Sequence, residues 1–150
     1  MIFNNDIKVD EIDINIIKLL KENGRIQNNE IASRLNISEG TVRNRIKKLM
    51  DADFLTIKGL INPCKIKDKM IIFLGIQLSE AKNLERAAAH FIELKDVTAV
   101  YMVTGRYDLF VEVFIEPYKL LNFLSDEMAN VDYIASTESF VTLKPYKKWI

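Results

Sequence analysis

The chain has 150 residues, 49% of them hydrophobic and 28% charged, which is enough apolar material for one ordinary domain or two small ones and excludes a disordered chain. Its 21 basic and 21 acidic residues give no net charge, so overall electrostatics do not identify a nucleic-acid-binding protein. The single cysteine, Cys64, excludes an internal disulfide and fits a reducing compartment. No secretion signal and no apolar run of bilayer length is visible, so we expect a cytoplasmic protein.

The first predicted helix spans residues 11–22. Asp10 is a suitable N-cap, and Asn23 with Gly24 closes the helix. Apolar side chains recur along one side of this helix and of the two helices that follow, which predicts a three-helix core. Its predicted members are Ile12, Ile16, Leu19, Leu20, Ile26, Ile31, Leu35, Val42, Ile46 and Leu49. Three helices of this size bury little surface, so we expect a further element to cover the bundle.

Residues 28–49 have the pattern of a helix-turn-helix. A helix is predicted over 28–35, a tight corner over 36–38 and a second helix over 39–50. Ser38 is the predicted N-cap of the second helix, since its hydroxyl can accept from an otherwise unpaired amide of the first turn. The upstream helix and the cap together favour this motif over an isolated basic helix.

The second of these helices has an apolar side and a basic side. At about 100° per residue, Val42, Ile46 and Leu49 share one stripe. Four positive charges and no negative ones lie between Val42 and Met50, among the residue types that contact phosphates and base edges in a major groove. The predicted DNA-binding residues are Gln27, Asn28, Ser38, Gly40, Thr41, Arg43, Asn44, Arg45, Lys47 and Lys48, of which Arg43, Asn44 and Arg45 are expected to govern sequence choice. The alternative is a solvated basic helix packed on its neighbour.

A short strand or wing is predicted over residues 54–61, where apolar residues are frequent and Gly59 is a weak point. Asn62 and Pro63 then interrupt the pattern. The composition changes here from basic helices to β-rich sequence. We therefore expect two domains, residues 1–62 and residues 63–150.

The second domain has the periodicity of a βαββαβ unit. Strands are predicted over 70–78, 97–104, 107–115 and 131–143, and helices over 81–94 and 117–129. This is the ferredoxin-like arrangement, a four-stranded antiparallel sheet with both helices on one face. The predicted fold class is therefore α+β, a winged helix-turn-helix domain followed by a ferredoxin-like domain.

Both faces of the predicted sheet carry apolar side chains. Within the strand over 107–115, Phe110 and Phe114 point to one face while Leu109 and Val111 point to the other. Since the helices cover only one face, we expect the other to pack against the same face of a second copy, giving a homodimer. Two recognition helices could then engage successive major grooves.

With both parts in view, the chain resembles the Lrp/AsnC family of transcriptional regulators, also called feast/famine regulatory proteins. The resemblance rests on DEIDINIIKLLKENGRIQNNEIASRLNISEGTVRNRIKKLMDADFL at residues 10–55, INP at 61–63 and VYMVTGRYDLFVEV at 100–113. It implies a regulator of operator DNA whose second domain forms dimers and higher assemblies, such as tetramers or octamers. It also implies that this domain binds an amino acid in a cleft between dimers. We expect no cofactor and no metal, because the sequence contains no metal-spaced cluster and no phosphate-cradling glycine loop.

The resemblance also assigns residues to the effector. They are Thr104, Gly105, Arg106, Tyr107 and Asp108 in the turn between the second and third strands, and Phe140 and Val141 in the last strand. Gly105 permits close approach, and Asp108 could pair with an α-ammonium group. Equally, both residues could merely build the hairpin turn. Arg106 stands where the family commonly has an acidic or neutral residue, so a relative's effector preference is not assumed.

Two other classes compete with a regulator. The two-domain arrangement also resembles that of sirohaem decarboxylases, which need proton donors and cationic groups around a tetrapyrrole. The chain has one histidine, His90, on a predicted helix, and no Ser/His/Asp set or metal-spaced cluster, so we expect it not to be an enzyme. The third class is an architectural DNA-binding protein without an effector, which a flat sequence preference would reveal.

Overall fold

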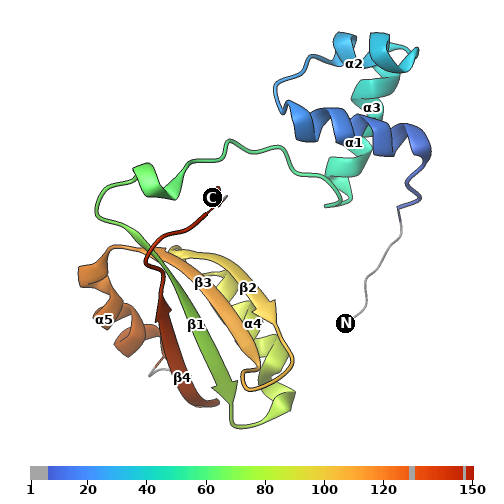
Figure 1. Ribbon diagram of the computed structural model, residues 1–150. Helices are drawn as coiled ribbons and strands as arrows, with labels where there is room; N and C mark the ends of the chain where they lie inside the picture. Colours follow the sequence, from blue (N-terminus) through green and yellow to red (C-terminus); the bar gives the residue numbers. More distant parts are fainter. Residues whose placement is uncertain (1–6, 129–130, 147) are drawn as a thin grey trace. The chain divides into compact units, whose positions relative to one another are not determined.

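The computed structural model describes residues 7–128, 131–146 and 148–150, which belong to two compact units (Figure 1). The first unit ends at Gly59 and the second begins at Leu60. The predicted domain boundary after Asn62 lies slightly further along the chain. The α+β class and the order of the two predicted folds are confirmed. No helix in the described ranges combines the length and the apolar character needed to cross a membrane.

The described residues of the first unit form three helices: α1 (Glu11–Glu22), α2 (Asn28–Leu35) and α3 (Glu39–Asp51). Their core consists of Ile16, Leu20, Ile31, Ala32 and Val42, with Ile12, Leu19, Ile26, Leu35 and Ile46 packed around it and Leu49 fully buried. The predicted three-helix core is thus confirmed. Asn36, between α2 and α3, has φ of 54°, a left-handed conformation that Asn tolerates better than most residues. This residue makes the sharp corner of the helix-turn-helix.

The predicted strand over residues 54–61 is wrong for this chain. The segment is irregular, and the side chains of Phe54, Ile57 and Leu60 are exposed. A strand needs a neighbour for its amides and carbonyls. In the described part of the chain, the segment's β-type pairing is limited to two backbone hydrogen bonds between Ile61 and Ile150, at 2.7 and 3.1 Å.

The second unit contains a sheet of four antiparallel strands in the order β2-β3-β1-β4 (Figure 1). The strands are β1 (Met70–Leu78), β2 (Val97–Met102), β3 (Leu109–Ile115) and β4 (Ile134–Val141), and the helices are α4 (Leu84–Ile92) and α5 (Leu120–Phe123). Short helical turns extend α5 from Pro117 to Met128, and the predicted end of that helix at Ala129 lies outside the described residues. The order of these strands and helices along the chain confirms the predicted βαββαβ arrangement.

One face of the sheet carries the core of this unit. The buried residues are Ile72, Leu74, Ile76 and Leu78 of β1, Leu109, Val111, Val113 and Ile115 of β3, Ala87, Ala88 and Phe91 of α4, and Phe123 of α5. Both helices therefore pack on the same face. The residues between them in sequence, including Phe110 and Phe114, point to the other face, which we call the open face.

The open face includes a buried carboxylate. Glu112 is 2% exposed, and its side chain accepts from the Thr98 hydroxyl at 2.5 Å and from Lys148 Nζ at 2.9 Å. Lys148 belongs to the C-terminal segment, which therefore lies partly over the open face of its own sheet. Tyr101 and Phe140 remain 48% and 40% exposed there. The single chain thus leaves aromatic surface on this face uncovered.

The ring of Tyr107 lies directly on the open face, over Gly75 of β1. A Cβ at Gly75 would lie 2.9 Å from three carbons of that ring. Phe110 and Phe140 flank Tyr107, with ring centroids 5.3 and 6.0 Å away in edge-to-face geometry. Glycine at this position therefore lets the aromatic cluster rest on the sheet backbone.

Replacing Gly75 by Ala should lower the free energy of unfolding by about 1 to 3 kcal/mol, because the added methyl group would clash with the Tyr107 ring. Denaturant unfolding of the whole chain measures this. Gly59→Ala is the matched control, since nothing lies within 4 Å of a Cβ built there, and it should leave stability unchanged or slightly raised. Adding Tyr107→Ser to Gly75→Ala should recover part of the loss. A Gly75→Ala variant as stable as the wild type would contradict the close contact.

Candidate nucleic-acid interface and effector loop

The second helix of the helix-turn-helix begins with a side-chain cap. The Ser38 hydroxyl accepts from the Thr41 N–H at 3.1 Å and lies 2.8 Å from the Thr41 hydroxyl. Both residues belong to the predicted DNA-binding set, and here their side chains hold the first turn of α3. Gly40 is exposed between them, and a Cβ there would meet only Ser38 Oγ, at 3.8 Å. The backbone at the start of α3 is therefore accessible to a ligand.

Three of the predicted DNA-binding residues lie on the exposed side of α3. Arg43, Asn44 and Lys47 are exposed, whereas Val42 is fully buried. Arg43 pairs with Glu39 one turn earlier at 2.5 Å, with both side chains largely in solvent. Such an exposed pair contributes little stability and can readily be exchanged for a phosphate. Lys48 is exposed as well, so this side of α3 presents three cations and one amide.

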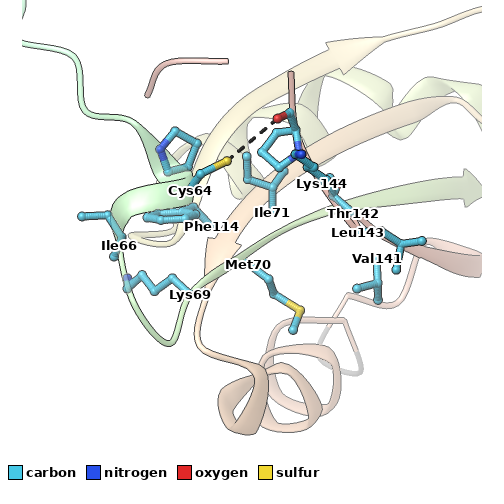
Figure 2. Close-up of a pocket in the computed structure, with 12 residues that line it drawn as sticks. Cys64, Ile66, Lys69, Met70, Ile71, Phe114, Val141, Thr142, Leu143 and Lys144 are labelled. Carbon is cyan, nitrogen blue, oxygen red and sulfur yellow. Dashed lines mark hydrogen bonds between the residues drawn. The ribbon is translucent and has the colours of Figure 1, made fainter. Parts of the chain in front are cut away.

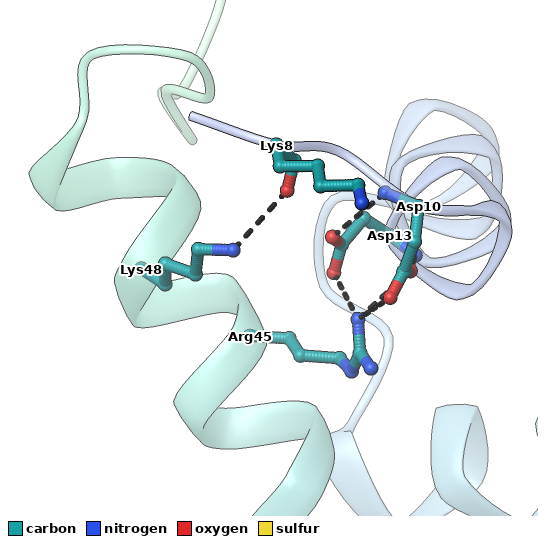
Figure 3. Close-up of polar contacts among 5 residues, drawn as sticks. All are labelled: Lys8, Asp10, Asp13, Arg45 and Lys48. Atoms are coloured by element: carbon teal, nitrogen blue, oxygen red, sulfur yellow. Dashed lines mark hydrogen bonds and ion pairs between the residues drawn. The ribbon is translucent and has the colours of Figure 1, made fainter. Parts of the chain in front are cut away.

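Arg45 and Lys48, two more residues of the predicted DNA-binding set, bond to groups of the protein itself (Figure 3). Arg45 Nη1 lies 2.7 Å from the Asp10 carboxylate and 2.8 Å from that of Asp13. The Arg45 side chain is 26% exposed, and that of Asp13 only 1%. Lys48 Nζ donates to the carbonyl oxygen of Lys8 at 3.2 Å. Both residues therefore contact the segment that leads into α1.

These contacts shift the protonation equilibria of Asp10 and Arg45. The Asp10 carboxylate accepts first from the Asp13 backbone N–H and then from Arg45, and these bonds hold the pKa of Asp10 below its ordinary value of 3.8. The carboxylate of Asp13, followed by that of Asp10, raises the pKa of Arg45. Asp10 and Asp13 also form a capping box at the start of α1. The ion pair therefore joins α3 to the N-terminal turn of α1.

Gln27 and Asn28 lie where α2 begins. The Gln27 carbonyl accepts from the backbone amides of Glu30 and Ile31, and its side chain makes no capping hydrogen bond. Both residues border an open polar hollow of about 410 Å³ that Glu39 of α3 also lines. The exposed Gln27 side chain therefore lies beside the first turn of α3.

The loop of residues 104–108 joins β2 to β3. Gly105 has φ of 116°, a conformation that side chains rarely adopt, so glycine is required there. The Asp108 backbone N–H donates to the Ile76 carbonyl at 2.9 Å, and Asp108 Oδ2 accepts from the Leu78 N–H at 2.7 Å. Asp108 thus fastens the loop to the end of β1, which gives weight to the turn-building alternative.

Three polar side chains meet beside this loop. The Tyr107 hydroxyl donates to Glu138 of β4, and Arg106 Nη2 lies 3.5 Å from the same carboxylate. The bond to Glu138, with burial as the second cause, raises the pKa of Tyr107. Arg106 is well exposed, with its guanidinium 5.3 Å from the Tyr107 ring centre. A cation of the loop, Arg106, and a carboxylate of β4, Glu138, therefore lie within reach of one small ligand.

The two effector residues predicted in β4 lie on opposite faces of the sheet. Phe140 pairs in register with Phe73 and Val141 with Ile72, so only Phe140 shares the open face with Tyr107. Sequence reasoning missed Glu138. The period of two in a strand places Glu138 on the same face as Phe140, and this signal could have found it.

A separate hollow of about 490 Å³ lies at the start of β1, between the turn around Cys64 and the segment after β4 (Figure 2). The apolar residues Ile71 and Phe114 line it, together with Lys69 and Lys144. Cys64 Sγ lies 3.9 Å from the Pro145 carbonyl oxygen. Of the predicted effector residues, only Val141 lines this hollow, so the loop of residues 104–108 is not part of it.

His90 lies on α4 against the ring of Phe91, at a centroid distance of 5.2 Å, and its Nε2 is 3.9 Å from Glu127. Its surroundings are those of a packed helix residue. Among the residues that the structure describes, no group of three or more His, Cys, Asp or Glu side chains could hold a metal ion.

A helix-turn-helix unit followed by a small βαββαβ domain defines the class of two-domain, DNA-binding transcriptional regulators. Residues 9–56 match the winged helix-turn-helix DNA-binding family, and residues 71–149 match the Lrp/AsnC ligand binding domain. This chain belongs to the Lrp/AsnC family of transcriptional regulators.

Relatives and solved structures match both units together. The chain is 34% identical over 145 residues to an uncharacterized HTH-type transcriptional regulator of Pyrococcus abyssi, covering 95% of this chain and 90% of that protein. It is 30% identical over 138 residues to the regulatory protein AsnC of Escherichia coli, covering 91% of each. The structure of that AsnC has a TM-score of 0.73 at 28% identity, covering 93% of this chain and 95% of the other. A transcriptional regulator of Neisseria meningitidis in complex with L-Met has a TM-score of 0.75 at 25% identity, covering 94% of each chain.

The pKa of Asp10 should rise toward 3.8 in Arg45→Gln, because one of the bonds that favour its charged form is lost. Because the folded-state pKa is the lower one, this carboxylate stabilises the fold above pH 3.8 and loses that effect as the pH falls through the folded value. An NMR titration of side-chain carboxyl signals between pH 2 and 6 measures the change. Arg34→Gln, which removes an exposed pair with Glu30, is the control and should leave Asp10 unchanged. An identical Asp10 titration in Arg45→Gln would contradict the ion pair.

Proposed function

We propose that this chain is a sequence-specific transcriptional regulator whose operator binding responds to an amino acid or a related small metabolite. The observation that carries the first part is the exposed side of α3, where Asn44 lies between Arg43 and Lys47 and opposite the buried Val42. An Asn amide can bond an adenine edge in the major groove, and cations beside it can neutralise phosphates. The partner is therefore double-stranded operator DNA, and the location that goes with this function is the cytoplasm.

The open face of the sheet supports a homodimer. Tyr101, Phe110 and Phe140 leave aromatic surface there, and both helices lie on the other face. A second copy that used the same face would cover this surface symmetrically. It would also hold two copies of α3 at a fixed spacing, which suits a palindromic operator. Such dimers could assemble further into tetramers or octamers.

The loop of residues 104–108 is the proposed effector site. Arg106 could pair with the carboxylate of an amino acid, and Glu138 with its ammonium group, while Gly105 lets the ligand approach the backbone. The related Neisseria meningitidis regulator forms a complex with L-Met, which supports an amino acid as the class of ligand. Asp108 serves the loop mainly through its bonds to β1. The effector would act by changing how dimers assemble.

Selection of bound duplexes from a random pool tests sequence preference, and Asn44→Ala should then cost about 1 to 3 kcal/mol at one position of the selected operator. Affinity for a random duplex of the same length should change little, because the phosphate contacts are kept. Asn122→Ala, an exposed Asn on α5, is the matched control and should bind like the wild type. Equal losses on both duplexes would argue against a base contact by Asn44. A flat selection profile would favour an architectural DNA-binding protein.

A screen of the common amino acids by thermal shift should show at least one that stabilises the wild type selectively. Arg106→Ala should reduce that shift, because the cation nearest the loop is removed, whereas Lys95→Ala, another exposed basic residue, should not. Arg106 is a better test position than Asp108, because loss of Asp108 would free the loop from β1. The effector proposal fails if no amino acid stabilises the wild type, or if Arg106→Ala responds like the wild type.

A further inference from the structure

We propose that Arg45 is a positioning residue that fixes the orientation of α3 for DNA binding, and that it contacts neither base nor phosphate itself. Its guanidinium is already bonded to two carboxylates, at 2.7 Å to Asp10 and 2.8 Å to Asp13 (Figure 3). Both come from the start of α1, far away in sequence. Arg45 therefore bonds α3 to the start of α1, although the basic composition of α3 would assign this residue to DNA.

Arg45 compensates a charge that the fold itself creates. Asp10 Oδ1 accepts the Asp13 backbone N–H at 2.9 Å, and Asp13 Oδ2 accepts the Asp10 N–H at 3.2 Å, so the capping box brings two carboxylates together. The side chain of Asp13 is 1% exposed. A buried carboxylate without a cation is strongly unfavourable, so Arg45 could leave for a DNA phosphate only at high cost.

The position of Arg45 along α3 shows what the ion pair controls. Residues 42, 45 and 49 recur at helical spacing on the side that faces the core, and Lys48 follows Arg45 by one turn. Lys48 bonds to the Lys8 carbonyl, so α3 is held at two successive turns against the segment that leads into α1. Two such contacts on one side restrain rotation of α3 about its axis. That rotation decides where Asn44 and its exposed neighbours meet the groove.

The proposal predicts an effect of opposite sign from simple electrostatics. Asp13→Asn removes a negative charge from a DNA-binding unit, and by charge alone this should strengthen DNA binding. If Arg45 acts by positioning α3, Asp13→Asn should instead weaken binding, because the guanidinium loses its buried partner. A residue that contacts DNA directly would not show this dependence on Asp13.

The test measures affinity of the whole chain for two probes, the duplex selected by the wild type and a random duplex of equal length, across a range of salt concentrations. Arg45→Gln and Asp13→Asn should each weaken binding to the selected duplex about tenfold or more. The ratio of the affinity for the selected duplex to that for the random duplex should therefore fall. The slope of log affinity against log salt should stay unchanged, whereas loss of a phosphate contact would lower it by about 0.9. The double variant should be no weaker than the weaker single variant. Arg45→Lys, which keeps the charge, should recover part of the binding.

Glu30→Gln is the matched control, because it removes a carboxylate from an exposed pair with Arg34 and should not weaken binding. Circular dichroism verifies that each variant is folded. Should the Arg45 and Asp13 variants not fold, NMR of the wild type decides the matter, since the Arg45 side-chain signals should be unchanged on saturation with DNA. The proposal is overturned if those signals shift on binding, if Asp13→Asn binds as well as or better than the wild type, or if Arg45→Gln lowers the salt slope.

Discussion

The second unit depends on a simple constraint, that two helices cover only one face of a four-stranded sheet. The helix-covered face forms a dry core from β1, β3, α4 and α5. In the described chain, the open face has no helices over it. It carries an aromatic cluster over Gly75 and a buried Glu112 that pairs with Lys148. The loop of residues 104–108 lies at the edge of this same aromatic cluster, because Tyr107 belongs to both. A ligand at the loop would therefore touch the surface on which a second copy is proposed to pack.

The first unit is subject to a different constraint. A three-helix bundle has a small core, and yet it must hold α3 in a defined orientation toward DNA. Apolar contacts around Ile16, Ile31 and Val42 hold the bundle together, but such contacts are not directional. Hydrogen bonds between charged groups are directional. The bonds between Arg45 and the capping box of α1 are of this kind. In this unit the cap of one helix and the orientation of another thus share the same carboxylates.

Periodicity was enough to predict the helices, the order of helices and strands along the chain, and the three-helix core, because each follows from the spacing of apolar residues. It could not assign Arg45, whose position on the helical wheel suits a groove contact as well as an ion pair with residues more than thirty positions away. The strand over residues 54–61 was wrongly predicted because apolar composition does not guarantee a pairing partner. Glu138 was not predicted, because the strand period gives its face of the sheet but not the register that brings it to the Tyr107 hydroxyl.

The bonds of Arg45 and Lys48 also bear on how such a protein would search a chromosome. Arg45 is bonded to two carboxylates, so the basic residues of α3 exposed to phosphates in the described structure are Arg43, Lys47 and Lys48. Of these, Arg43 already pairs with Glu39 and Lys48 with the Lys8 carbonyl. Few phosphate contacts mean weak attachment to arbitrary DNA, so little of the protein would be held on the excess of non-operator sites. Occupancy of an operator would then depend on base contacts and on the joining of two copies, and so on whatever alters their assembly.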